Sequence, residues 1–109
     1  MANTFKLKTK ANEGVTKVGI YTAPAATTTV VIGITMANTS GSGVNVGVGI
    51  TRAGTTEDVK LLKNAPIPQG SSLEFMSGNK IVLEATDTVT VDSDTNNSVD
   101  AALTIMEIT

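Results

Sequence analysis

Apolar and polar residues alternate along most of the chain, and a period of two is typical of half-buried β-strands. The alternating segments cover residues 4–10, 15–22, 27–51, 59–64, 71–76, 80–84, 88–91 and 99–108. Turn-forming residues separate them, and no segment of ten or more residues has helical periodicity. The pattern predicts an all-β domain: an antiparallel β-sandwich of about eight strands, Ig-like or jelly-roll-like, with no substantial helix.

The stretch Thr27–Thr51 is predicted to be one long β-hairpin around which the other strands are arranged. Its first arm alternates at Val30, Ile32, Ile34 and Met36, and its second arm alternates at Val44, Val46, Val48 and Ile50. A Ser/Gly-rich bend separates the two arms. The registers that match the apolar residues pair Ile34 with either Val46 or Val48, because a slip by one residue would turn the apolar set to solvent.

Either register brings small residues together on the second face of the hairpin. These residues are Gly33, Thr35, Asn45, Gly47 and Gly49. Glycine inside a strand costs stability, and its usual reason is the close approach of another backbone. We therefore expect this face to be covered by a segment of the same chain or by a neighbouring subunit, with simple solvent exposure as the remaining alternative.

Residues 1–14 are predicted to form an edge strand or a docking arm. Phe5 and Leu7 fall on one side of the strand and are expected to face inward, whereas Lys6, Lys8 and Lys10 fall on the other side. Charged residues on an edge discourage unwanted strand addition. Phe5, Lys6 and Lys8 are accordingly candidates for an interface.

The composition of this single 109-residue domain counts against several classes of function. The formal net charge is -2, so the chain lacks the basic surface expected of proteins that bind nucleic acid or an anionic membrane. It contains no cysteine and no histidine, which removes the usual disulfide, zinc and imidazole chemistry. We expect a protein that is not an enzyme, uses no cofactor and is made in the cytoplasm, because its N-terminus has no apolar signal region.

Acidic residues provide two weak candidates for chemistry. Asp92, Asp94 and Asn96 alternate as the first ligands of a calcium loop do, but Asn97 and Leu103 stand where an EF-hand requires glycine and glutamate. Four carboxylates, Glu74, Glu84, Asp87 and Glu107, are separate candidates for a glycosidase pair. The chain has two phenylalanines, one tyrosine and no tryptophan, so few rings are available to stack on sugars.

Tyr21 is the chain's single tyrosine. We expect its ring to be buried and its hydroxyl to bond a backbone group, the usual arrangement in a small sandwich.

Four segments of the chain, spread over most of its length, carry a resemblance to a known family: Ile20–Ala25, Ile32–Thr39, Ala65–Leu73 and Lys80–Ala85. Together they resemble the small virion structural proteins of tailed bacteriophages. Such chains often carry glycine before the aspartate that follows the last segment, whereas here Thr86 precedes Asp87.

The resemblance implies a non-enzymatic β-sandwich subunit that assembles symmetrically with other virion proteins. The first hypothesis is a capsid decoration (cement) protein that forms a homo-oligomer and is assembled in the host cytoplasm. A neck, tail or fibre accessory subunit is the second hypothesis. A carbohydrate- or calcium-binding adhesion module is the alternative from another class.

Overall fold

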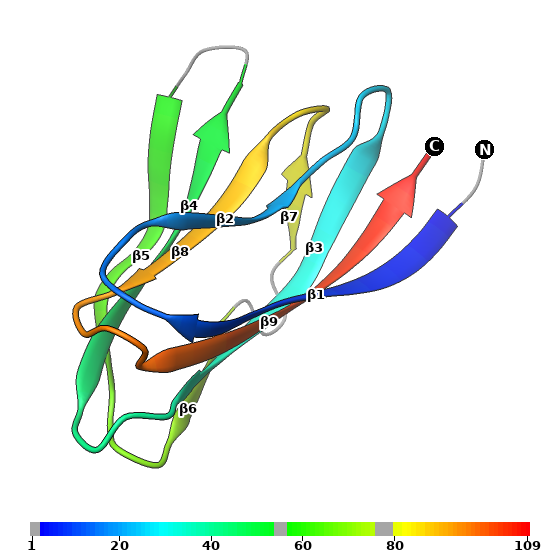
Figure 1. Ribbon diagram of the computed structural model, residues 1–109. Coiled ribbons are helices and arrows are strands. Elements are labelled where there is room, and N and C mark those ends of the chain that lie inside the picture. The colour runs from blue at the N-terminus through cyan, green and yellow to red at the C-terminus, as the bar shows by residue number, and fades with distance from the viewer. Residues whose placement is uncertain (1–2, 54–56, 76–79) are drawn as a thin grey trace.

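The computed structural model describes residues 3–53, 57–75 and 80–109, which form two facing β-sheets (Figure 1). The described residues contain nine strands and no helix, and so no helix that could cross a membrane. The strands are β1 (Asn3–Glu13), β2 (Val18–Thr22), β3 (Thr28–Asn38), β4 (Val44–Arg52), β5 (Glu57–Ile67), β6 (Ser72–Phe75), β7 (Ile81–Leu83), β8 (Thr88–Ser93) and β9 (Val99–Ile108). The prediction of an all-β sandwich is confirmed.

The strand order is that of a jelly roll. The first sheet has the order β1-β9-β3-β6, with β7 also paired to β3, and the second sheet has the order β2-β8-β4-β5. All pairs are antiparallel. The chain crosses between the sheets at every connection except β4–β5 and β6–β7, so β6 and β7 together occupy one position of an eight-stranded double-sheet roll.

The predicted hairpin over Thr27–Thr51 is wrong, because β3 lies in the first sheet and β4 lies in the second. The Ser/Gly-rich segment between them arches across the end of the sandwich. Asn38 fixes this arch: its amide nitrogen donates to the carbonyl oxygens of Ser42 (2.8 Å) and Ile67 (2.9 Å). Alternation identified both strands but carries no information about which strand is the partner.

A β-bulge in β3 also changes the predicted core. The pairing of β3 with β9 shifts between Val31 and Gly33. As a result Val31, Ile34 and Met36 are buried, while Val30 and Ile32 are half-buried. A bulge adds one residue to one strand and so reverses the inward and outward positions on one side of it.

The hydrophobic core lies between the sheets and consists mainly of β-branched and leucine side chains. Its most deeply buried members include Met36, Val46, Val48, Ile67, Leu83, Val91, Leu103 and Ile105.

Strand β5 is longer than predicted, since it continues through Pro66 to Ile67. Pro66 pairs with Asn45 of β4, and no other described strand pairs with the far side of β5. Proline lacks a backbone N–H, so an edge strand can hold it. The strand predicted over residues 71–76 is observed as β6, and its residue 76 lies outside the described residues.

Candidate functional site

Strand β1 forms one edge of the first sheet and presents its apolar side chains to solvent. Phe5 and Leu7 are 69% and 64% exposed, so the expectation that they face inward is wrong. Lys6 instead points inward, and its Nζ lies 2.9 Å from Oε1 of Glu107 on the neighbouring strand β9. Glu107 is buried, and a buried carboxylate requires a cation or hydrogen-bond donors. This requirement accounts for the orientation of β1.

A polar cluster of Lys6, Tyr21, Thr29 and Glu107 joins the start of β1 to both sheets. The Tyr21 hydroxyl donates to Oε2 of Glu107 (2.6 Å) and lies 2.8 Å from the Thr29 hydroxyl oxygen. The ring of Tyr21 is buried as predicted, but its hydroxyl partners are side chains and not the predicted backbone group. Burial, together with the bond to Glu107, raises the pKa of Tyr21 to about 12. Tyr21 and then Lys6 hold the pKa of Glu107 below its usual range.

The outer face of the first sheet carries an apolar row that runs from one edge to the other. Phe5 pairs with Met106, Met106 pairs with Val30, and Val30 pairs with Val82. Met106 and Val30 are half-buried, whereas Phe5 and Val82 at the two ends are 69% and 59% exposed. Isolated exposed apolar residues are common, but a contiguous apolar band across a sheet is typical of an interaction surface.

Beside the apolar row, the same face is hollowed over small side chains. The hollow has a volume of about 350 Å³ and its floor includes Ala11, Thr35, Ala37 and Ala102. Thr35 is thus a member of this outer face, as a residue of β3 opposite Ala102. The face thus has both raised and concave areas, a shape to which a partner surface can be complementary.

A second concavity opens between the sheets where β7 faces β4 and β5. This cleft, of about 380 Å³, has apolar walls that include Ile50, Val59, Ile81 and Val82. Its polar end holds Arg52, Glu84 and Asp87.

The charged residues of the cleft bind one another. The Arg52 guanidinium is paired with the Glu84 carboxylate, and its Nε lies 3.0 Å from Oδ2 of buried Asp87. The backbone N–H of Glu84 donates to the same Asp87 oxygen (3.0 Å). Arg52 is therefore neutralised and is not a free anion-binding group.

The three candidate glycines do not share a face, contrary to the prediction. Gly33 lies in the first sheet opposite Thr104, and Gly47 and Gly49 lie in the second sheet opposite Asp92 and Thr90.

Gly47 and Gly49 are covered by atoms of the same chain. A Cβ at Gly49 would lie 2.8 Å from the Val59 carbonyl oxygen, and one at Gly47 would contact the Asp92 carboxylate and lie 3.3 Å from the Leu62 carbonyl oxygen. Carbonyl oxygens of β5 therefore lie close against the glycines of β4.

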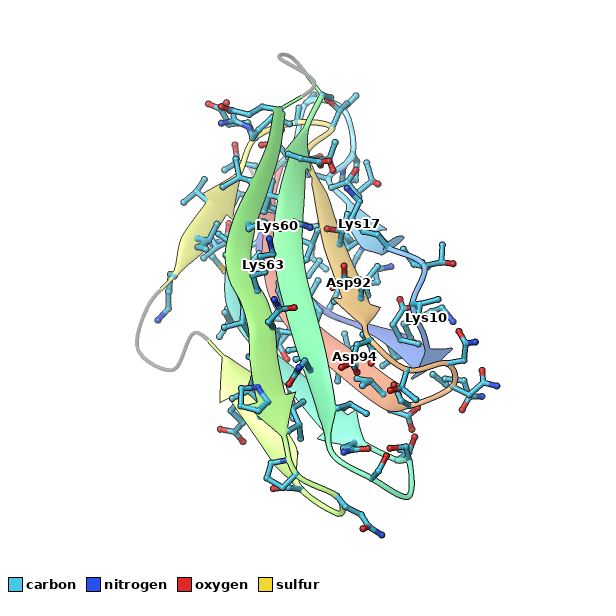
Figure 2. All side chains as sticks on the ribbon, turned by 90° about the vertical axis from the view of Figure 1, so that its left-hand side faces the viewer. Lys10, Lys17, Lys60, Lys63, Asp92 and Asp94 are labelled. Atoms are coloured by element: carbon cyan, nitrogen blue, oxygen red, sulfur yellow. The ribbon has the colours of Figure 1, made fainter. Side chains whose placement is uncertain are left out.

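The calcium candidates lie at the end of β8 and in the loop that follows, and each of the three lies against another part of the chain. Asp92 covers Gly47, and Oδ1 of Asp94 accepts the backbone N–H of Asn45 (3.1 Å). Figure 2 shows Asp92 on β8 and Asp94 in the loop that follows, with Lys60 and Lys63 on β5, which β4 separates from β8. Asn96 lies against Gly14. Within residues 3–53, 57–75 and 80–109, no group of three acidic side chains converges as a metal site.

The four carboxylates considered for glycoside hydrolysis fall in three places. Glu107 belongs to the polar cluster with Lys6, and Glu74 is exposed on β6. Glu84 and Asp87 lie together, and both are paired with Arg52.

Sequence reasoning missed Arg52, Val82 and Met106 as parts of these surfaces. For Val82 and Met106, alternation showed only that each side chain lies on the side of its strand that faces away from the core. Neither could be assigned to a common row without the pairing of β3 with both β7 and β9.

The fold and its open apolar face define a jelly-roll domain suited to packing against other protein subunits. No protein-family model matches the sequence, and no match is found among curated proteins. Several solved structures share the fold.

A subunit of Bacillus endospore appendages, which are described as disulfide-linked pili, is 16% identical, with a TM-score of 0.57 over 99% of this chain and 87% of that one. A chain of the cyanophage Pam1 capsid asymmetric unit is 15% identical, with a TM-score of 0.55 over 95% and 84%. The VP2 protein of infectious bursal disease virus, in T=1 particles, is 12% identical, with a TM-score of 0.60, and the matched 96% of this chain spans only 31% of it. At these identities the likeness is one of fold.

Proposed function

We propose that this chain is a non-enzymatic structural subunit of a bacteriophage particle, namely a capsid decoration protein. It would assemble in the host cytoplasm, as a homo-oligomer in contact with other virion proteins. The observation that carries the proposal is the apolar row, because its exposed ends on β1 and β7 would be buried in an assembly. The fold it shares with a phage capsid chain supports the same reading.

Composition favours a capsid-associated subunit over a subunit of disulfide-linked pili, while length does not separate the two. The Pam1 chain is similar in length to this one, since 95% of this chain aligns with 84% of it. The endospore appendage subunits belong to disulfide-linked pili, and this chain has no cysteine with which to form such links. A small jelly roll added to a shell is therefore the better proposal than a covalently linked fibre.

Localisation on the particle tests the proposal directly. Cryo-electron microscopy of virions, or immunogold labelling with an antibody against this chain, is expected to place it on the outer surface of the head. Density at the neck, tail or fibres would favour the accessory-subunit hypothesis instead. Absence of the chain from purified virions would refute both.

Binding to particles that lack the chain tests which face is used. Replacing Phe5 and Leu7 together by aspartate should abolish binding, because both side chains are exposed on the outer face of the first sheet. Val15→Asp is the matched control, since Val15 is also an exposed apolar residue (55%) but lies outside that sheet. If the control loses binding equally, the assignment of the face is wrong.

The adhesion alternative makes a different prediction. A carbohydrate-binding or calcium-binding module should give saturable binding on a glycan array or heat in a calcium titration. The decoration proposal expects neither, since Asp92 and Asp94 are occupied by contacts within the chain.

A further inference from the structure

The two edges of the first sheet match each other in a way that fits a second copy of this chain. The edge at β1 ends the apolar row with Phe5, and the opposite edge at β7 ends it with Val82. Apart from Val15, the exposed large apolar side chains among the described residues lie at these two places: Phe5 and Leu7 on β1, Val82 on β7, and Val59 on the wall of the cleft beside β7.

Strand direction allows the two edges to pair. β1 is antiparallel to β9, β9 is antiparallel to β3, and β3 is antiparallel to β7. β1 and β7 therefore run in opposite directions within one molecule. A second copy in the same orientation would bring its β1 antiparallel to β7 of the first copy, and the sheet would continue with the pairing it already has.

Both strands have backbone groups free to make this contact. Among the described residues, β1 pairs with β9 only and β7 pairs with β3 only. An unpaired strand edge is a template for another strand, and most proteins protect it with charges or proline on the edge. β1 does carry lysines on its inner side, of which Lys6 is neutralised by Glu107. On its outer side the residues that flank such a contact, Phe5 and Leu7, are apolar and exposed, which favours strand addition.

The cleft beside β7 provides apolar surface for the other side of the added strand. Its walls include Ile50, Val59 and Ile81. With Phe5 opposite Val82, Lys6 lies opposite Ile81, so its methylene stem can cover these walls while its ammonium group stays with Glu107 of its own chain.

We propose that β1 of one subunit adds to β7 of the next, with Phe5 beside Val82, so that the apolar row continues from copy to copy. This contact is heterologous, since two different patches meet, and repetition of it generates a ring or an open array. The right-handed twist of sheets rotates each copy relative to the previous one, which favours closure over a flat layer. The proposal rests on the proposed structural role and names the contact through which subunits of that kind assemble.

Cysteine cross-linking tests the contact cleanly because the wild-type chain has no cysteine. Opposite residues in an antiparallel pair have Cβ atoms about 5 Å apart, which is close to the separation that a disulfide needs. Phe5→Cys and Val82→Cys proteins, mixed at millimolar concentration and oxidised, are expected to shift to a disulfide-linked dimer on a non-reducing gel. The Phe5→Cys/Val82→Cys double variant is expected to give a ladder of higher oligomers.

The controls separate this contact from the other possibilities. Mixing Val15→Cys with Val82→Cys should give only background dimer, because Val15 is exposed but outside the contact. A dimer formed by Phe5→Cys alone would show that two β1 edges meet, and no dimer in the mixture would show that the edges do not meet. Either result overturns the proposal.

The same variants keep this inference distinct from the proposed function. Cross-linked ladders from a chain that is absent from virions would uphold the contact and refute the decoration role. If the chain is found on the capsid but its cysteine pair does not cross-link, the decoration role is upheld and the β1–β7 contact is refuted.

Discussion

The hydroxyl of Tyr21 donates a 2.6 Å hydrogen bond to the carboxylate of Glu107, and this bond joins the second sheet to the first. Both residues are buried, and Lys6 completes the charge balance from the edge strand. The position of β1, and with it the exposure of Phe5 and Leu7, therefore depends on a polar cluster inside the sandwich. Strand β1 therefore links the buried polar cluster to the candidate assembly surface.

Tyr21→Phe should lower the free energy of unfolding by about 1 to 3 kcal/mol, because it leaves the buried Glu107 carboxylate without a donor and the buried Thr29 hydroxyl without its acceptor. Chemical denaturation followed by circular dichroism measures the change. Thr22→Val is the matched control, since Thr22 makes a hydroxyl bond of 2.9 Å to Thr88 that is exposed to solvent. The cluster would have no structural importance if both variants lost the same small amount.

The titration of Tyr21 should be visible in isolation, because the chain has one tyrosine and no tryptophan. Ultraviolet absorbance of the folded protein is expected to show a midpoint near pH 12, against about pH 10 in denaturant. Since the folded pKa is the higher one, the stabilisation is complete below pH 10 and is lost as pH rises from 10 towards 12. A native midpoint near pH 10 would contradict the buried bond to Glu107.

Glu107 should make stability depend on pH at the acidic end. Its pKa is lowered in the folded protein, so its contribution is present above the unfolded value of about 4.3 and is lost as pH falls through the folded value. Lys6→Met removes one cause of the lowered pKa and should flatten this acid dependence, measured as unfolding free energy between pH 6 and about pH 3. Lys10→Met is the control, because the Lys10 ammonium bonds the Ala11 carbonyl oxygen and no carboxylate. An unchanged slope in Lys6→Met would argue against the ion pair.

Much of the fold was predictable from alternation, because every strand of this sandwich has one face towards the core. The partners of the strands were not predictable. Lys6 and Glu107 lie at opposite ends of the chain, and their contact depends on β1 pairing with β9. The alternating residues of Thr27–Thr51 fit a hairpin as well as an arch, and the arch follows from the pairing of β3 with β9 and of β4 with β8, strands that come much later in the chain. The bond from Asn38 to the carbonyl of distant Ile67 holds the arch in place.

The candidate surface was only partly predictable for the same reason. Phe5 was identified as an interface residue, but its expected inward orientation was wrong because the carboxylate of Glu107 attracts Lys6 to the inner side. The bulge between Val31 and Gly33 then turned Val30 outward to join the apolar row. A single inserted residue in a strand leaves no clear trace in an alternating sequence.

Thr86 is expected to be a strained position whose replacement stabilises the protein. Its φ angle is 70°, in the left-handed region that β-branched residues rarely adopt, and its N–H donates to the Ala23 carbonyl oxygen (2.9 Å). Thr86→Gly should raise the free energy of unfolding by about 0.5 to 1 kcal/mol, since relief of roughly 1 to 2 kcal/mol of strain exceeds the entropy cost of glycine.

Thr16→Gly provides the comparison for Thr86→Gly in thermal unfolding. Thr16 is exposed in a bend and has no positive φ, so glycine there should lower the melting temperature. Equal losses in the two variants would mean that Thr86 carries no strain.

Gly49 should tolerate no side chain, because β5 lies too close to it. A Cβ at this position would be 2.8 Å from the backbone oxygen of Val59, which cannot move without disturbing the pairing of β4 with β5. Gly49→Ala is therefore expected to cost about 1 to 3 kcal/mol of unfolding free energy, as overpacking does in a closed interior.

Gly47→Ala should cost less, since its nearest neighbour is the Asp92 side chain, which can rotate. Gly41→Ala is the control, because nothing lies within 4 Å of its Cβ position, and it should change stability by less than about 0.5 kcal/mol. If Gly49→Ala is as stable as Gly41→Ala, the contact between the two strands is looser than the structure has it, and the glycines of β4 have no packing role.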